Sequence, residues 1–412
     1  MVLAKGRTSV QGFSVQALSR ALFKAELPEH EIRALPAQSL YLALKHNGIS
    51  SSAPIVELAS DQQCQLMLDM DLFSRDRFNE EQLWEWLALS SEEAELEVLQ
   101  KLLRCFDYKL IAILIARHVE FSYFEEPTDQ PPGPQHYTPD KGRTWLHIKI
   151  TEAEKHFLLG RLLALIFETD SDLFYKLLSI AQADTLSSLE EGAFIDRTRR
   201  LSAEGIPAAD YAFELTAPFP EKLAAAALQV DAQHPVEHGI FGVEPLIYQP
   251  GMLKPFQELF EQAEDREALE SELTLITNAA LIRYAVELGE LPAVILCVRQ
   301  VRGAINVGLE RATELSKLNV GEIHARLGIK QLFGLGIGLI NDLRRLAQQK
   351  SQSTAEPSPE EQLAIEAASL VFPMVPEFML SSAPPAVDGK LPSDRKPIET
   401  LEELARLRQI LK

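Results

Sequence analysis

Cysteine is scarce in this chain of 412 residues, which holds only three, at positions 64, 105 and 297. Three thiols so far apart do not build a disulfide scaffold, and the absence of a C-x-x-C pair excludes zinc ribbons and thioredoxin-type sites. Cys105 and Cys297 lie within apolar segments, where a cysteine usually serves as a small buried hydrophobe. The sequence therefore predicts buried thiols without a redox or metal role.

Long hydrophobic runs are also missing. The longest uncharged apolar stretches, residues 273–282 and 331–341, have about half of the roughly 20 residues that a membrane-spanning helix needs. Residues 1–20 contain no apolar core ahead of the second arginine, so we expect no signal peptide there. These features predict a cytoplasmic protein that does not insert into a membrane.

Basic residues are outnumbered, with 40 lysines and arginines against 60 aspartates and glutamates, which gives a formal charge of −20. An acidic chain repels phosphate and gains nothing from counterion release, so we exclude nucleic acid as a general partner. Docking on an anionic membrane is disfavoured for the same reason. The hydrophobic content of 46% is nevertheless that of an ordinary globular chain with a sizeable core.

Helix-start signals recur along the chain. At Ser358 and at Thr400 an N-cap oxygen is followed three residues later by a glutamate, Glu361 or Glu403. The same spacing occurs at Asn79, Ser90, Thr151 and Ser187. Between residues 54 and 121, leucine-rich segments with apolar residues at i, i+3, i+4 and i+7 follow one another with very short links. We therefore predict an all-α fold of stacked antiparallel helices, as an irregular superhelix or bundle.

One stretch departs from the helical pattern. Residues 119–125 alternate as a strand does, a loop rich in proline, glycine and aspartate follows at 126–143, and residues 144–150 alternate again. We predict one small two-stranded β ribbon, which must pack against helices because a lone ribbon is only marginally stable. A loop of this length is either functional or mobile.

Composition divides the chain into five parts. We expect an N-terminal helical superhelix in residues 1–118, the ribbon with further helices in 119–232, a connector rich in proline and glycine in 233–255, a C-terminal helical bundle in 256–350, and a flexible link, a proline-rich arm and a final helix in 351–412. The prolines of residues 371–400 predict an arm that lies over the surface.

The sharpest chemical motif is H-x-x-E-H, formed by His234, Glu237 and His238. In inverted zinc proteases, two histidines at this spacing bind one metal ion while the glutamate activates water. Pro235 weakens the analogy, because any helix must begin beside the first ligand. We keep a metal-dependent hydrolase as an alternative, but we favour a loop with two surface histidines and predict no cofactor.

Glycines 334, 336 and 338 lie in an apolar segment that lacks the preceding strand and the Lys-Ser/Thr pair of a phosphate-binding loop. Gly334 and Gly338 are four residues apart, so on a helix they leave a groove in which a second helix packs closely. Gly303 and Gly308 suggest the same. We therefore predict helix packing here, and no nucleotide site.

A basic cluster stands out in this acidic chain at Arg197, Arg199 and Arg200. It is typical of a solvated face with local ion pairs, and the alternative is a site for an anion or an acidic partner. No nucleophile elbow and no recognisable catalytic cysteine–histidine signature accompanies it.

Further surface candidates lie at Arg75 and Arg77, and at two tryptophans. Trp84 and Trp86 fall on different sides of one predicted helix, so we expect one in the core and the other at a contact surface. If these residues share a concave face with the basic cluster, an acidic peptide or an anionic ligand fits it.

The order of segments resembles a known family. Its distinctive runs are D-x-D-L-F-S-R-D-R-F at residues 69–78 and S-L-E-E-G-A-F-x-D-R-T-R-R at residues 188–200. Over about residues 54–349 the chain resembles an uncharacterised, mostly helical bacterial protein family, a domain of unknown function. The resemblance implies a bacterial cytoplasmic protein and assigns no activity or catalytic residue. More loosely, residues 54–118 are similar to the superhelical cytosolic domain of magnesium transporters and of flagellar switch proteins, a likeness that says little about function.

Stacked amphipathic helices without a coherent catalytic constellation favour a non-enzymatic binding or scaffold protein with a protein partner. Two alternatives remain open: the metal-dependent hydrolase, and a helical regulator that binds a small anionic ligand at the basic cluster. Base rates leave a homodimer open as well.

Overall fold

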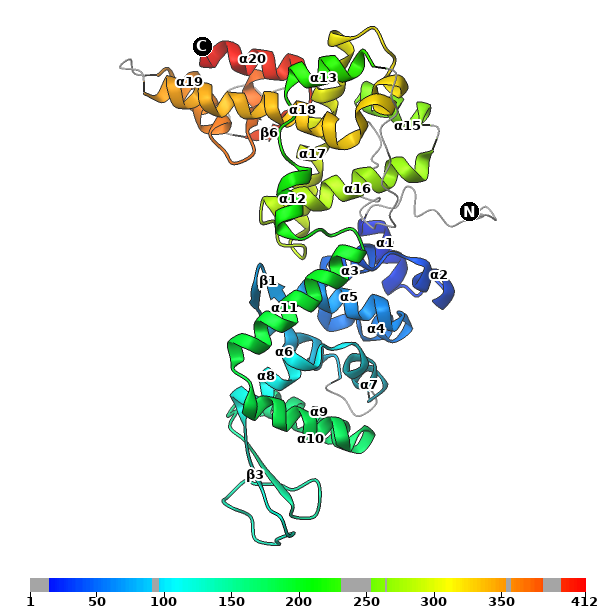
Figure 1. Cartoon of the computed structure of the whole chain (residues 1–412), viewed down its shortest axis with the longest axis vertical. Coiled ribbons are helices and arrows are strands. Elements are labelled where there is room, and N and C mark those ends of the chain that lie inside the picture. Colours follow the sequence, from blue (N-terminus) through cyan, green and yellow to red (C-terminus); the bar gives the residue numbers. More distant parts are fainter. Residues whose placement is uncertain (1–14, 91–95, 231–252, 264, 353–356, 381–393) are drawn as a thin grey trace. The chain divides into compact units, whose positions relative to one another are not determined.

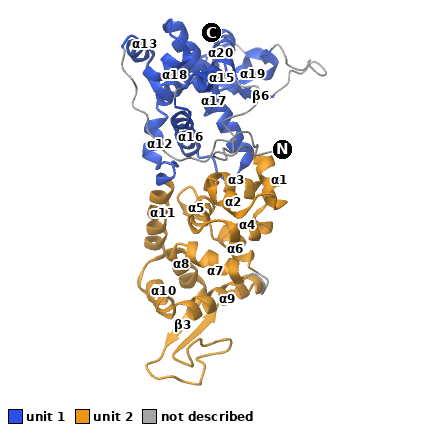
Figure 2. Cartoon of the chain, turned by 90° about the vertical axis from the view of Figure 1, so that its right-hand side faces the viewer, with its two compact units in different colours: residues 1–14, 202–412 blue, residues 15–201 orange. Residues whose placement is uncertain are grey.

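The computed structural model describes residues 15–90, 96–230, 253–263, 265–352, 357–380 and 394–412 (Figure 1). It divides into two compact units: residues 15–201, and residues 202–412 together with 1–14 (Figure 2). The described chain is mostly helical and its strands form only two-stranded sheets, so the predicted all-α class is confirmed.

Short helices joined by short links build the unit of residues 15–201. They are α1 (Val15–Phe23), α2 (Glu29–Ala34), α3 (Ala37–Asn47), α4 (Ala53–Leu58), α5 (Asp61–Asp71), α6 (Glu80–Ala88), α7 (Leu96–Cys105), α8 (Tyr108–His118), α9 (Ala153–Thr169), α10 (Ser171–Ala183) and α11 (Leu186–Ala203). The apolar periodicity of α7 buries Val98, Leu99, Leu102 and Leu103 on one face. The amphipathic pattern read from the sequence thus produces the core of this unit.

The predicted ribbon is present. Strands β3 (Val119–Tyr123) and β4 (Thr144–Ile148) pair antiparallel, with Phe121 opposite Leu146. The loop between them doubles back, because Tyr137 forms a bridge to the other edge of Leu146. A second ribbon, which we did not predict, joins β1 (Phe73–Ser74) to β2 (Arg77–Phe78).

The turn of this second ribbon, formed by Arg75 and Asp76, has an unusual backbone. Arg75 sits at its tip with φ of 60°, in the left-handed region that few residues other than glycine adopt. A two-residue strand pair gives no alternation to recognise, which is why the pattern analysis missed it.

Longer helices build the other unit: α12 (Ala209–Leu215), α13 (Glu221–Leu228), α15 (Lys254–Gln262), α16 (Arg266–Arg283), α17 (Leu291–Leu315), α18 (Val320–Ser351), α19 (Pro359–Ala368) and α20 (Leu401–Leu411). Helices α17 and α18 pack at its centre, and the glycines allow the close approach. A Cβ on Gly336 would lie 1.8 Å from the carbonyl oxygen of Ala304, and one on Gly308 would lie 2.0 Å from that of Leu332. Gly308 and Gly336 therefore provide the helix packing that was predicted. Gly334 and Gly338, predicted to form the groove for a second helix, instead face residues 217–219 between α12 and α13.

Helix α18 is interrupted once. Gly328 has φ of 65° and ψ of 170°, which no helix accommodates, so the element is two helices that meet at a break. The main-chain N–H of Ile329 begins the second segment and donates to the Glu272 carboxylate of α16 at 2.8 Å. A side chain from another helix thus caps the new helix start.

The described parts of the proline-rich arm form a third ribbon, from β5 (Met374–Pro376) and β6 (Arg395–Pro397). We expected the arm to lie over the surface, whereas Val375 and Ile398 are fully buried. A Cβ on Gly303 of α17 would meet the carbonyl oxygen of Ile398 at 2.3 Å. Close backbone contact with α17 holds this segment in the core.

Two further predictions concern the connector and membrane insertion. The connector of residues 233–255 falls almost entirely outside the described residues. In the part of the chain that the structure describes, every helix is too short or too polar to cross a bilayer.

Candidate functional site

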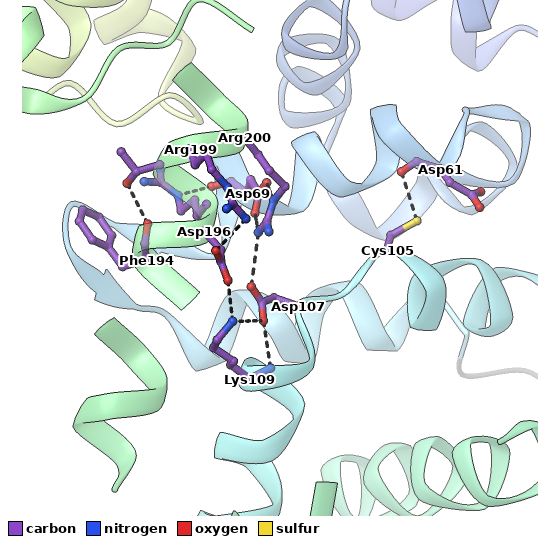
Figure 3. Close-up of polar contacts among 11 residues, drawn as sticks. Asp61, Asp69, Cys105, Asp107, Lys109, Phe194, Asp196, Arg199 and Arg200 are labelled. Carbon is purple, nitrogen blue, oxygen red and sulfur yellow. Dashed lines mark hydrogen bonds and ion pairs between the residues drawn. The ribbon is translucent and has the colours of Figure 1, made fainter. Parts of the chain in front are cut away.

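The basic cluster of α11 lies against α5 and the start of α8, within the unit of residues 15–201 (Figure 3). Arg200 reaches Asp69 of α5 in a two-pronged contact: its Nε and Nη2 atoms donate to the two carboxylate oxygens, each at 2.7 Å. Its Nη2 also lies 3.5 Å from Asp107, the N-cap of α8. Arg200 therefore ties three helices together.

Arg197 is bound internally as well. Its Nε donates to the main-chain carbonyl of Asp69, and its guanidinium lies over the rings of Phe73 and Phe194, with centroids at 5.3 and 5.9 Å. Burial lowers the pKa of Arg197 to about 10, and the neighbouring Asp69 opposes that shift. The guanidinium still carries its charge at neutral pH, but it is covered by protein.

The third arginine lies on the outer face of α11. Arg199 has a side chain 78% exposed, and its contact with Asp196 at 2.9 Å spans one turn of the helix. Asp196 in turn accepts from Lys109 at 2.6 Å, which holds the pKa of that carboxyl below its ordinary value. Arg199 is thus the one member of the cluster that faces solvent.

The electrostatics of Asp69 explain why two arginines gather there. Burial raises the pKa of Asp69, and the hydrogen bonds and charge of Arg200 act against that shift. A buried carboxylate is stable only when donors surround it. Arg197 and Arg200 therefore neutralise a buried charge of the protein itself, whereas the sequence predicted a solvated face with local ion pairs.

The ribbon β1–β2 packs on the same helix. Phe73 lies 6.0 Å from Phe194, ring centroid to centroid, and the N–H of Phe78 donates to Glu190 at 2.8 Å. These contacts bring the run at residues 69–78 against the run at residues 188–200. The two segments that carried the family resemblance are thus partners in one local structure.

These two segments expose three arginines, Arg75 and Arg77 of the ribbon and Arg199 of α11, and one isoleucine, Ile195 of α11, which is 58% exposed. Asp76, between the two ribbon arginines, and Glu191 of α11 are exposed as well. We call the three arginines and the isoleucine the arginine face. It is the part of the predicted surface that remains open to a partner.

The tryptophans do not belong to it. We expected one indole at a contact surface, but Trp84 is 4% exposed and Trp86 is fully buried. The Nε1 of Trp86 donates to Asp71 at 2.8 Å, and that of Trp84 donates to Glu80 at 3.1 Å. Both indoles are buried and both donate to carboxylates within the unit. The expectation of an exposed indole was therefore wrong.

No cluster of three or more metal-ligating side chains occurs among the described residues. The H-x-x-E-H motif of His234, Glu237 and His238 lies outside them. The three cysteines are buried and unpaired. Cys105 and Cys297 are buried as predicted, and burial raises the pKa of the Cys297 thiol to about 12.

A shallow groove of about 650 Å³ runs along α18 in the other unit. It is lined by Asn341, Arg344, Arg345, Gln348, Ser351 and Ser369. Arg345 lies 3.4 Å from Asp342 on the same helix, in an exposed pair that contributes little.

Fold and site define a mostly helical protein whose most distinctive cluster is an internal carboxylate–arginine network. One family model matches the chain over residues 1–412, and its description is a family of unknown function, DUF6178. The chain belongs to this family. No curated protein and no solved structure matches it. The resemblance to a family of unknown function is thereby confirmed, while a bacterial origin and the likeness to magnesium transporters stay predictions.

Asp69, Asp107 and Lys109 were not predicted as partners of the basic cluster. Asp69 lies 131 residues from Arg200, and Lys109 lies 87 residues from Asp196, so no local spacing indicates either pair. The two distinctive runs were the one available signal, but their charges do not indicate contact: residues 69–78 hold three aspartates and two arginines, and residues 188–200 hold three acidic and three basic residues.

Proposed function

We propose that the protein is a non-enzymatic, cytoplasmic binding module whose arginine face docks an acidic segment of a protein partner. The observation that carries the proposal is the division of the cluster: Arg197 and Arg200 are held by Asp69, whereas Arg75, Arg77 and Arg199 remain exposed. Exposed arginines beside an exposed isoleucine are the composition of a docking surface, because a guanidinium binds carboxylates in a two-pronged manner.

The net charge of the chain supports the same conclusion. A formal charge of −20 repels an acidic partner everywhere except where basic residues gather. A local basic surface therefore selects the orientation in which such a partner approaches. The left-handed backbone of Arg75 is a strained feature of the kind that functional positions tend to hold.

The test is crosslinked capture of the tagged protein from its native cytosol. We compare the wild type with the double variant Arg75→Glu/Arg77→Glu and with a control, Arg20→Glu/Lys24→Glu, which changes the net charge equally at exposed positions of α1 and just beyond it. We expect a stoichiometric partner whose recovery falls at least about tenfold for the first variant only. Equal recovery from both variants, or equal loss, would contradict the proposal.

The alternatives make separate predictions. A hydrolase built on His234, Glu237 and His238 requires about one equivalent of bound zinc that is lost in His238→Ala, and metal analysis of the captured protein measures this.

A small anionic ligand at Arg197 and Arg200 must displace the Asp69 carboxylate, so it is disfavoured there. The groove along α18, with Arg344 and Arg345 exposed, is the better position for such a ligand.

A further inference from the structure

The ribbon β3–β4 has one edge on which the backbone is unpaired. In an antiparallel pair, every second residue directs its N–H and C=O toward the partner strand and the others direct them away. Lys149 donates to the carbonyl of His118, and Phe124 donates to that of Arg143, each at 2.8 Å. The even positions from 118 to 124 therefore face β4, and Phe121 and Tyr123 turn their backbone groups outward.

The partner strand confirms this alternation. Leu146, which is opposite Phe121, exchanges both of its hydrogen bonds with Tyr137 on its other side, at 3.0 and 2.8 Å. The outer edge of β4 is thus covered by the loop. No such cover exists for β3: within the described residues, the backbone groups of Phe121 and Tyr123 have no hydrogen-bond partner. Figure 1 shows the ribbon extending away from α9 and α10.

The side chains along this edge have a consistent character. Tyr123 is 65% exposed, an uncommon exposure for an aromatic residue on a strand. Glu120, Glu125 and Glu126 are all exposed, and none of them forms an ion pair with another described residue. The basic residues of the ribbon, Arg143 and Lys149, flank the other strand.

We propose that the outer edge of β3 binds an extended, basic segment of a partner protein, which adds to the ribbon as a further strand. Backbone groups of Phe121 and Tyr123 supply the hydrogen bonds, Tyr123 supplies apolar contact, and the three glutamates select lysine or arginine. This site is independent of the arginine face, because it lies on other elements and carries the opposite charge.

The probe is a blocked synthetic peptide of about eight residues in which arginine alternates with valine, and its matched control carries glutamate in place of arginine. Hydrogen exchange of the full-length protein is measured with each peptide at about 1 mM. We expect the amides of Phe121 and Tyr123 to exchange at least about tenfold more slowly with the arginine peptide only. The amide of Ser122, already directed at β4, should not change.

Two variants separate strand addition from contact with the side chain. Tyr123→Pro removes an outward N–H and leaves the ladder with β4 intact, a position at which proline is tolerated. Tyr123→Ala removes the ring and keeps the N–H. Strand addition predicts that affinity for the arginine peptide falls at least about tenfold more in the proline variant than in the alanine variant.

Other outcomes would overturn the proposal. Equal losses in the two variants would assign recognition to the tyrosine ring. Protection of Phe121 and Tyr123 that appears without peptide as the protein concentration rises would identify a second copy of the chain as the occupant. Equal protection of these amides by the two peptides, or protection by neither peptide, would show that this edge does not select a basic segment.

Discussion

Asp69 accepts from two arginines of α11 at once, through its carboxylate to Arg200 and through its main-chain carbonyl to Arg197. The side chain of Asp69 is 8% exposed and that of Arg200 is 22% exposed, so both charges have left most of their water. A pair of this kind contributes little net stability compared with apolar residues, but it becomes expensive when one partner is removed.

Asp69→Asn tests this asymmetry. The amide keeps the shape of the side chain and leaves Arg200 with only its longer ion pair, to Asp107 at 3.5 Å. We expect the free energy of unfolding to fall by about 2–4 kcal/mol. Urea denaturation monitored within residues 15–201 measures it. Arg199→Ala is the control, because its exposed pair with Asp196 should change stability by less than about 0.5 kcal/mol. A similar loss in both variants would show that the network contributes nothing specific.

At this scale the sequence revealed one side of the network. It predicted a solvated face with local ion pairs at Arg197, Arg199 and Arg200, which describes Arg199 but not the half-buried Arg197 and Arg200. Which of the three arginines is exposed depends on the angle around α11: residues 197 and 200 face Asp69, and residue 199 faces solvent. That division requires knowledge of which helix lies opposite, and no local pattern contains it.

The helical elements followed from the sequence where a cap is purely local. Ser358 with Glu361 forms both hydrogen bonds of the expected box, and Thr400 accepts from Glu403 as predicted. Two other starts are displaced: α9 begins after Glu152 rather than Thr151, and the cap near α11 is Thr185 rather than Ser187. Packing decides between neighbouring candidates that have nearly equal capping energies.

The contact between α17 and α18 makes a prediction about matched glycines. Gly336→Ala places a Cβ 1.8 Å from a main-chain carbonyl, which only movement of a helix can relieve. Gly338→Ala, half a turn along, meets Pro218 at an ordinary 3.6 Å. We expect the first to destabilise by about 3 kcal/mol or more and the second to be neutral or stabilising by up to about 1 kcal/mol. Thermal unfolding of the two variants compares them, and equal effects would contradict close helix packing.

The loop of residues 126–143 makes a prediction about pH. The Asp140 carboxylate accepts from the N–H groups of Arg143 and Thr144 and from the hydroxyl of Tyr175. Burial raises the pKa of Asp140, but these hydrogen bonds outweigh it and hold the pKa below its ordinary value of 3.8. The loop therefore has its full stabilisation above that value and loses it as the pH falls through the lower pKa of the folded state.

Hydrogen exchange of the Arg143 and Thr144 amides measures this loss, once corrected for intrinsic rates. Asp140→Asn is the control, because it should show weak protection at every pH. Protection that stays unchanged well below pH 3.8 in the wild type would show that Asp140 does not secure the loop.

At the scale of the whole molecule, each of the two compact units has its own core. Tyr41, Trp86 and Phe174 are fully buried in residues 15–201, and Phe256 and Phe333 are fully buried in residues 202–412. We expect Asp69→Asn to lower hydrogen-exchange protection within residues 15–201 and to change that of residues 202–412 by less than about 0.5 kcal/mol. Gly336→Ala should show the reverse. Parallel losses across the whole chain would mean that the units unfold together.

The break in α18 also bears on which changes in chain length the fold tolerates. An inserted residue turns every later residue of a helix by about 100°, unless something interrupts the helix. Between residues 329 and 336, such an insertion would rotate Gly336 away from α17 and place a side chain against Ala304. The rotation caused by an insertion between residues 320 and 327 would end at Gly328, because the backbone is already non-helical there. Relatives of this protein should therefore vary in length before Gly328 and keep a constant spacing from Ile329 to Gly336.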